Sequence, residues 1–183
     1  MSRHVFRFAA ALTLVGVASF LTACEESNPP AEQAAPTSSA SQPRPPAYDV
    51  PFRTDAELEV EIGALCVDSV NRERPLLLEF SAAWCSDCRK LNDMKSDRAL
   101  AQELREWPSL TVNVGRFDRH TELMASLGVE SIAHWAILEP GDCATPVETW
   151  ARRAARTLEV SSGEARNLTP RDLAEWLSGF RKT

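Results

Sequence analysis

Leu76-Leu77-Leu78-Glu79-Phe80 and Trp84-Cys85-Ser86-Asp87-Cys88 are the two stretches that decide the fold of this chain. The first is an apolar run of strand length, and the second places two cysteines two residues apart directly after it. A helix that starts at the motif would place unpaired backbone N–H groups and its positive dipole end beside Cys85, which favours a thiolate there. A thiolate with a second thiol one turn away can attack a disulfide and then release the mixed intermediate.

The first 23 residues have the features of an export signal. Arg3 and Arg7 precede an apolar run over residues 8–20, which is short for a membrane span. The run Leu21-Thr22-Ala23-Cys24 resembles the bacterial lipobox, in which the cysteine is lipidated; the alternative is an ordinary secretory signal with a cysteine near its cleavage site. We expect a protein that is lipid-anchored in the bacterial cell envelope through Cys24 and faces the periplasm or extracytoplasmic space.

Composition divides the rest of the chain into a tether and one domain. Residues 24–49 hold six of the 12 prolines, with Ser, Ala, Gln and Glu between them, and cannot bury enough apolar surface to fold. Residues 50–183 have the length of a single domain. The sequence carries 20 Lys and Arg against 26 Asp and Glu, a net charge of −6, which argues against nucleic acid as a partner.

Capping signals and periodicity predict an α/β domain. Thr54-Asp55-Ala56-Glu57 is a capping box that opens a helix, and Thr169 followed by Pro170 opens the closing helix. The predicted order α-β-α-β-α-β-β-α gives a central mixed sheet with helices on both faces. The elements between the first and last helices are a strand over 76–80, a helix from Cys85 or Ser86 with a second piece capped by Ser96-Asp97, a strand over 110–114, a helix from Asp118 to Leu127 stopped by Gly128, and strands over 135–138 and 147–150.

Residues 54–180 resemble the thioredoxin superfamily. The run from Glu79 to Cys85 matches the family's strand-to-motif segment, and the run from Gly128 to Ile132 matches the approach to its cis-proline loop. The run over residues 81–90 also resembles the C-terminal thioredoxin-like domain of DsbD. The resemblance implies a thioredoxin fold and a thiol–disulfide oxidoreductase without a cofactor. Such an enzyme would reduce or isomerise disulfides of exported proteins and would receive electrons from a membrane reductase.

The motif residues have expected roles within this resemblance. Cys85 is the expected nucleophile and Cys88 the buried resolving thiol; the alternative is a structural disulfide, although a bond closing so short a loop stabilises little. Glu79 is the expected proton acceptor for Cys88, the alternative being an edge-strand acid that points into water. Trp84 is expected to shield the thiols and contact the substrate, or to be ordinary packing.

Ala133 stands where the family carries its cis-proline. Since a cis bond before a non-proline residue costs roughly 3–4 kcal/mol, we expect the bond between Ile132 and Ala133 to be trans. Both residues are still expected to contact the substrate chain. The missing proline leaves two other functions open. One is a metal-handling protein that holds Cu(I) with Cys85, Cys88 and His134, although no resident metal is assigned, and the other is a non-catalytic adaptor.

Two further cysteines and two histidines are interpreted more simply. Cys66 and Cys143 lack partners at motif spacing, so each is expected to be a small buried apolar residue, with a disulfide between them as the alternative. His134 is expected to make an ordinary hydrogen bond at a strand end, and His120 to be exposed at a helix start.

Overall fold

The structure is a computed structural model that describes residues 48–160 and 168–181. The predicted signal, Cys24 and the tether up to residue 47 lie outside the described residues. Tyr48, which the sequence places in the tether, packs against the domain, where its hydroxyl is hydrogen-bonded to Ser81 Oγ at 2.8 Å. In the described ranges, no helix combines the length and the apolar composition that crossing a membrane requires.

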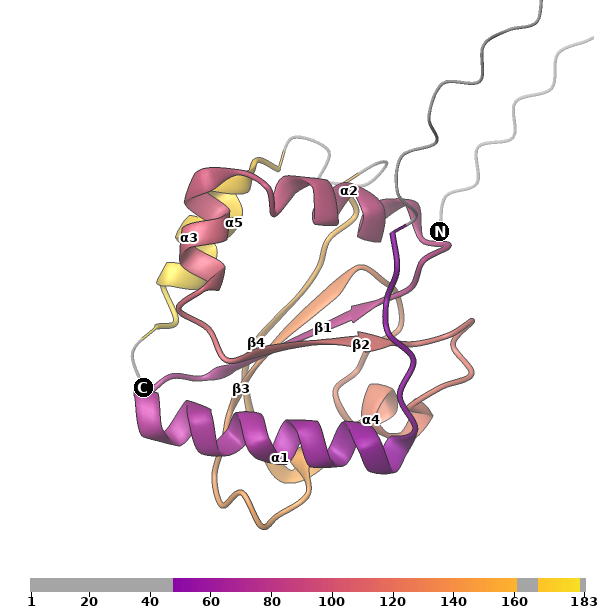
Figure 1. Ribbon diagram of the computed structural model, residues 1–183, viewed down its shortest axis with the longest axis vertical. Coiled ribbons are helices and arrows are strands. Elements are labelled where there is room, and N and C mark those ends of the chain that lie inside the picture. The colour runs from indigo at the N-terminus through magenta and orange to yellow at the C-terminus, as the bar shows by residue number, and fades with distance from the viewer. Residues whose placement is uncertain (1–47, 161–167, 182–183) are drawn as a thin grey trace, which may run out of the picture. The chain divides into compact units, whose positions relative to one another are not determined.

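The described domain is built around a mixed sheet with the strand order β2-β1-β3-β4. Strand β1 is parallel to β2 and antiparallel to β3, and β3 is antiparallel to β4. Figure 1 shows α1 and α4 on one side of this sheet and α2, α3 and α5 on the other. The expected mixed sheet with helices on both faces is therefore confirmed. The elements are α1 (Asp55–Arg72), β1 (Leu76–Ser81), α2 (Ser86–Met94), α3 (Arg98–Leu104), β2 (Ser109–Asn113), α4 (Thr121–Ser126), β3 (His134–Glu139), the 3₁₀ helix η1 (Val147–Thr149), β4 (Ala151–Thr157) and α5 (Pro170–Ser178).

Local capping signals predicted the helix starts well. At α1, Thr54 Oγ1 accepts from the Glu57 backbone N–H, and the Glu57 carboxylate accepts from the Thr54 N–H, which is the predicted capping box. Asp97 caps α3, as predicted, by accepting from the N–H of Ala99. The capping box at Thr169 is likewise present. All six residues of β1 are buried, so the strand that precedes the cysteine motif forms the centre of the core.

The start of α4 differs from the prediction. The sequence placed it at Asp118, but the helix begins at Thr121. Asp118 Oδ1 instead accepts from the Arg116 backbone N–H at 2.8 Å, which closes a turn. His120 then takes a left-handed backbone conformation with φ 53°. The expectation that His120 is exposed is also wrong, because it is only 7% exposed and its ring pairs with the Asp55 carboxylate.

The strand predicted over residues 147–150 is wrong as well. Val147–Thr149 forms η1, in which the Thr149 N–H donates to Pro146 O at 2.9 Å, and β4 begins only at Ala151. Strand β4 lies at the edge of the sheet and is largely exposed. Because it buries little surface, it has no alternating apolar pattern that a sequence-based prediction could detect.

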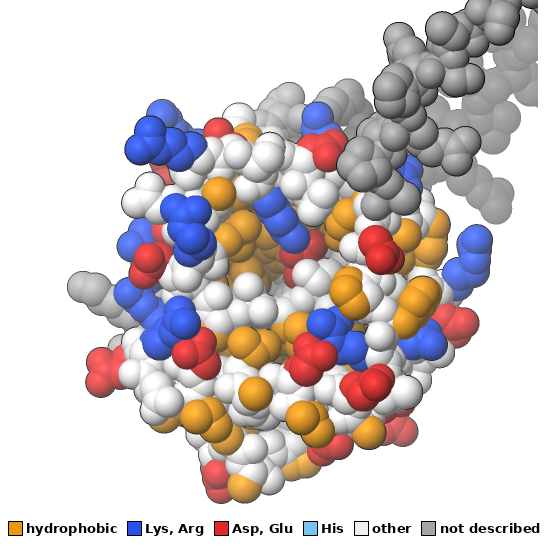
Figure 2. Space-filling model, viewed as in Figure 1, with side chains coloured by type: hydrophobic (Ala, Val, Ile, Leu, Met, Phe, Trp, Pro, Cys, Tyr) orange, Lys and Arg blue, Asp and Glu red, His pale blue; other side chains and the backbone are white. Residues whose placement is uncertain are grey.

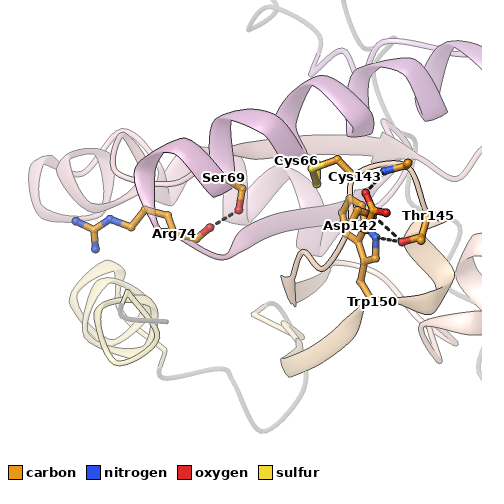
Figure 3. Close-up of a disulfide and its surroundings, with 8 residues drawn as sticks. Cys66, Ser69, Arg74, Asp142, Cys143, Thr145 and Trp150 are labelled. Atoms are coloured by element: carbon orange, nitrogen blue, oxygen red, sulfur yellow. Dashed lines mark hydrogen bonds between the residues drawn. A yellow bond between two sulfur atoms is a disulfide. The ribbon is translucent and has the colours of Figure 1, made fainter.

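Cys66 and Cys143 are joined by a disulfide (Figure 3). The Cα atoms are 5.7 Å apart, and the two cysteines are separated by 77 positions in the sequence. The expectation that each is an unpaired apolar residue is therefore wrong, and the alternative is correct. Only the tertiary fold brings α1 next to the segment that follows β3, so spacing in the sequence could not decide between the two.

Candidate active site

Cys85 is the N-cap of α2, so the helix positions its sulfur directly. The Cys88 backbone N–H donates to Cys85 Sγ at 3.1 Å. The two cysteines are disulfide-bonded, with Cα atoms 5.2 Å apart, and the structure therefore shows the oxidised pair. Cys88 is fully enclosed, whereas Cys85 is 5% exposed. The helix terminus thus stabilises negative charge on Cys85 and leaves Cys88 as the inner sulfur.

Glu79 lies in the middle of β1 and is 5% exposed. Its Oε2 forms an ion pair with Nζ of Lys95, the residue that follows α2 as its C-cap. Glu79 Oε1 is buried and has no hydrogen-bond partner among the described residues. The unpaired oxygen keeps its lone pairs available for a hydrogen bond, and the role of proton acceptor for Cys88 stays a prediction.

A hollow of about 150 Å³ adjoins this carboxylate, and its lining includes Leu77, Glu79, Lys95 and Leu110. Figure 2 shows the viewed face hollowed in its upper left part, with hydrophobic side chains on the floor of the hollow. A hollow of this size holds water where it has polar lining atoms. Water there would connect Glu79 to solvent, so a proton taken up by the carboxylate has a way out.

Tyr48 lies on the same side of β1. Burial raises the pKa of its hydroxyl, the nearby charge of Glu79 adds to this, and the hydrogen bond with Ser81 acts in the opposite direction. The hydroxyl therefore stays protonated at neutral pH and remains a hydrogen-bond donor close to the Glu79 charge.

Trp84 is held in place although it is 45% exposed. Its indole Nε1 donates to Gly115 O at 2.6 Å, and its ring lies 6.0 Å from that of Phe117, which is also exposed. Gly115 has φ 59°, and a Cβ there would collide with Asp118 Oδ1, so the loop that carries Phe117 depends on this glycine. Next to Cys85, the two rings thus form a fixed, exposed aromatic surface.

Ile132 and Ala133 lie at the same end of the sheet as the dithiol. The antiparallel pairing of Phe80 with His134 places the start of β3 beside the end of β1, just before the cysteine motif. The peptide bond between Ile132 and Ala133 is cis, so the expected trans bond is wrong. Ala133 is fully buried and its carbonyl accepts from the Leu158 N–H at 2.7 Å. These neighbours set the course of the loop, which residue type alone did not predict.

His134 makes the plain hydrogen bond expected of it, between Nδ1 and Thr157 Oγ1 at 3.0 Å. Its Nε2 is buried without a hydrogen-bond partner among the described residues. Burial lowers the pKa of the imidazole, and the nearby charge of Arg152 lowers it further. Across residues 48–160 and 168–181, no group of three or more His, Cys, Asp or Glu side chains is placed to hold a metal.

The sequence analysis missed Lys95, Tyr48 and Phe117. Lys95 had a detectable signal, because it follows Cys88 and Leu91 at helical spacing and therefore belongs to the buried face of α2. Tyr48 and Phe117 had none, since each meets the site only through contacts between segments far apart in the sequence.

Known proteins resemble this chain in sequence and in fold. The family model described as Thioredoxin matches residues 66–159. The solved disulphide isomerase from Xylella fastidiosa Temecula1 aligns with a TM-score of 0.56 and 20% identity over 73% of this chain and 98% of that chain. The C-terminal domain of Neisseria meningitidis DsbD in its reduced form aligns with a TM-score of 0.50 and 15% identity over 69% and 98%. At these identities the two structures establish the fold alone. No curated protein matches the sequence.

Proposed function

The chain belongs to the thioredoxin family and is a thiol–disulfide oxidoreductase, and from this premise we propose that it reduces or isomerises disulfides of exported proteins outside the cytoplasm. The predicted export signal and the cysteine at position 24 support this location. The Xylella fastidiosa protein of the same fold is a disulphide isomerase, which supports the same class of substrate.

The proposed reaction uses Cys85 first. In the reduced protein, the Cys85 thiolate attacks one sulfur of a substrate disulfide, which forms a mixed disulfide and releases the other substrate sulfur as a thiolate. Cys88, as a thiolate, then attacks Cys85 Sγ, releases the second substrate sulfur and leaves the Cys85–Cys88 disulfide. Two electrons have then moved from the protein to the substrate, whose two sulfurs each take up a proton.

Glu79 is proposed to accept the proton that Cys88 loses before its attack. The buried carboxylate is supported in this role by its free Oε1 and by the adjoining hollow, which leads the proton to water. Trp84, Ile132 and Ala133 are proposed to contact the substrate chain, since they lie at the end of the sheet where α2 begins.

A further cycle needs an electron donor, because the reaction leaves the cysteine pair oxidised. We propose a membrane reductase with a dithiol of its own, which would attack Cys85 and pass two electrons back. Lipid on Cys24 would hold the domain at the membrane surface, within reach of such a donor. The position of Cys85 at the helix terminus, where a thiolate is favoured, supports thiol exchange over the adaptor alternative.

The observation that carries the proposal is the contact between the Cys88 N–H and Cys85 Sγ at the start of α2. The test is to express Cys88→Ser and Cys85→Ser variants of the full chain with its export signal and to look for mixed disulfides on non-reducing gels. We expect Cys88→Ser to accumulate adducts with exported proteins and Cys85→Ser to accumulate none.

The matched control is the Cys66→Ala/Cys143→Ala double variant, which keeps the dithiol and should turn over without trapping. Adducts on Cys85→Ser instead of Cys88→Ser would reverse the assigned roles. An absence of adducts from both variants, with the purified native protein also unable to reduce insulin, would overturn the proposed function.

A further inference from the structure

A second concave site lies away from the dithiol. It is a pocket of about 480 Å³ between α1, α4 and residues 143–150. Its lining includes none of the residues assigned to thiol exchange. The floor is apolar and well buried, being formed by Leu58, Ile62, Leu123 and Trp150. The volume falls in the range of pockets that bind small molecules or one or two side chains of a partner.

The rim of the pocket is strongly acidic. Asp55, Glu59, Glu122 and Glu148 line it, and its described lining contains no lysine or arginine. Asp55 pairs with the buried His120. The other three carboxylates are exposed, and they form no ion pair or hydrogen bond with another described side chain. The charge of these three carboxylates has no counter-ion in the pocket lining. It therefore attracts a cationic ligand that also carries apolar groups.

Gly63 keeps the hollow open. A glycine inside a helix such as α1 costs roughly 0.5–1 kcal/mol relative to alanine. Packing does not require it, because a Cβ at Gly63 would meet no atom within 4 Å. Since Gly63 lines the pocket, the space left by its missing side chain is part of the pocket itself.

The opposite wall is fixed before anything binds. Cys143 lines the pocket and is tied to α1 through its disulfide with Cys66 (Figure 3). In the same segment, Trp150 Nε1 donates to Thr145 Oγ1 at 3.2 Å, and Thr145 Oγ1 donates to Asp142 O at 2.7 Å. A wall held in this way loses little conformational entropy when a ligand arrives.

We propose that this pocket is a docking site for a basic peptide segment of a partner protein. The cationic side chain of the segment lies among the carboxylates of Glu59, Glu122 and Glu148, and a neighbouring apolar side chain enters the hollow beside Gly63. Charge complementarity identifies this occupant, and the carboxylates come from three separate segments of the chain, which suits an extended peptide better than a compact ion.

The test measures binding without any redox step. Fluorescence anisotropy is recorded with the oxidised full-length protein and a labelled, cysteine-free peptide, Lys-Leu-Lys-Leu-Lys, against its twin Ser-Leu-Ser-Leu-Ser. We expect the basic peptide to bind at least tenfold more tightly than the neutral one, and 0.5 M salt to weaken its binding. Gly63→Leu, which fills the hollow, and Glu122→Lys, which reverses charge at the rim, should each weaken it at least tenfold.

Two matched variants separate the pocket from general surface charge. Ala64→Leu adds the same side chain at the next, exposed position of α1, and Glu175→Lys makes the same charge change on α5; neither residue lines the pocket. Both should bind the basic peptide within twofold of the native protein. The proposal is overturned if these controls weaken binding as much as the pocket variants, or if the two peptides bind alike. It is also overturned if spermidine displaces the basic peptide and binds more tightly, because the occupant would then be a small cation. Because Glu122→Lys changes only an exposed side chain, the result stands even if Gly63→Leu fails to fold.

Discussion

Lys95, at the C-terminal end of α2, forms an ion pair with Glu79 in the middle of β1. The helix therefore presents Cys85 at one end and supplies the counter-ion of the buried carboxylate at the other. Lys95 thus supplies a counter-charge to a carboxylate that is almost completely enclosed.

Glu79→Gln should slow the second step of the proposed reaction more than the first. The amide cannot accept the Cys88 proton, whereas the attack of Cys85 on the substrate does not need Glu79. We expect release of product from the mixed disulfide to slow by roughly ten- to a hundredfold, at or below the lower end of what acid–base catalysis contributes, because water in the hollow can replace part of the role. Rapid-quench analysis of a single turnover measures both steps.

Glu103→Gln is the matched control, since Glu103 is, among the described residues, a second buried carboxylate with a basic partner, Arg181. It lies on α3 and should leave both rates unchanged. Equal slowing by the two variants would mean that loss of a buried charge, and not loss of a proton acceptor, explains the effect.

The Cys66–Cys143 disulfide should contribute most of the stability that comes from cross-links. It closes a loop with a sequence separation of 77, for which chain entropy predicts about 4.5 kcal/mol in the free energy of unfolding. The separation at Cys85–Cys88 is only 3, which gives about 1–2 kcal/mol. The two disulfides are compared by urea unfolding of two double variants, Cys66→Ala/Cys143→Ala and Cys85→Ala/Cys88→Ala. Each variant is measured against the oxidised native protein. A larger loss from the second pair would contradict the assignment of Cys66–Cys143 as the structural bond.

Sequence predicted the parts of this fold that depend on local chemistry. The capping residues Thr54, Asp97 and Thr169 each accept hydrogen bonds from backbone N–H groups two or three residues ahead, so the signal and the structure lie within one turn. The apolar run that became β1 is buried at every position, which gives a strong hydrophobic signal. The same run led directly to the motif that begins α2.

The failures arise where distant segments decide the outcome. Cys66 and Cys143 meet only after the sheet has assembled, and His120 is buried because α4 packs next to Asp55. Ala133 is fully enclosed and its carbonyl accepts from Leu158, so its surroundings also come from a distant segment of the chain. Strand β4 was missed for the opposite reason, since an exposed edge strand needs no apolar pattern. For the site, the sequence supplied Cys85, Cys88 and Glu79 but not the cation that accompanies the carboxylate.

His134 should make stability depend on pH in mildly acidic solution. Burial lowers the pKa of its imidazole in the folded protein below the ordinary 6.5. As the pH falls through 6.5, the unfolded chain takes up the proton first, so the free energy of unfolding decreases from about pH 7 downward. One proton limits the slope to about 1.4 kcal/mol per pH unit. His134→Gln should flatten the decrease between pH 7 and 5.5 in urea titrations, whatever its effect on absolute stability; identical slopes would exclude His134 as the source.

Cys24→Ala tests the proposed lipidation of Cys24. Loss of the acceptor thiol should release the protein from membranes or leave the signal uncut, because lipidation and cleavage of such signals are coupled at this cysteine. Cell fractionation with intact-mass measurement distinguishes these outcomes, and Ser27→Ala, three positions further on, is the control. Unchanged membrane association together with the normal mature mass would show that the anchor lies elsewhere.

Trp84→Ala should impair the reduction of proteins but spare that of small disulfides. The exposed rings of Trp84 and Phe117 offer a flat apolar contact to a substrate chain, and loss of one aromatic contact of about 1 kcal/mol corresponds to about a fivefold rise in KM. Trp84→Phe keeps an aromatic ring and loses only the hydrogen bond to the Gly115 carbonyl, which water can replace on this exposed loop. The KM of this variant should therefore lie between those of Trp84→Ala and the native protein. Steady-state reduction of insulin and of a small aromatic disulfide gives the two readouts.

Phe52→Ala removes another exposed aromatic ring, one that contacts Arg119 and not Trp84, and should change neither. If Trp84→Ala slows both substrates equally, Trp84 supports the dithiol itself and not the docking of a substrate chain.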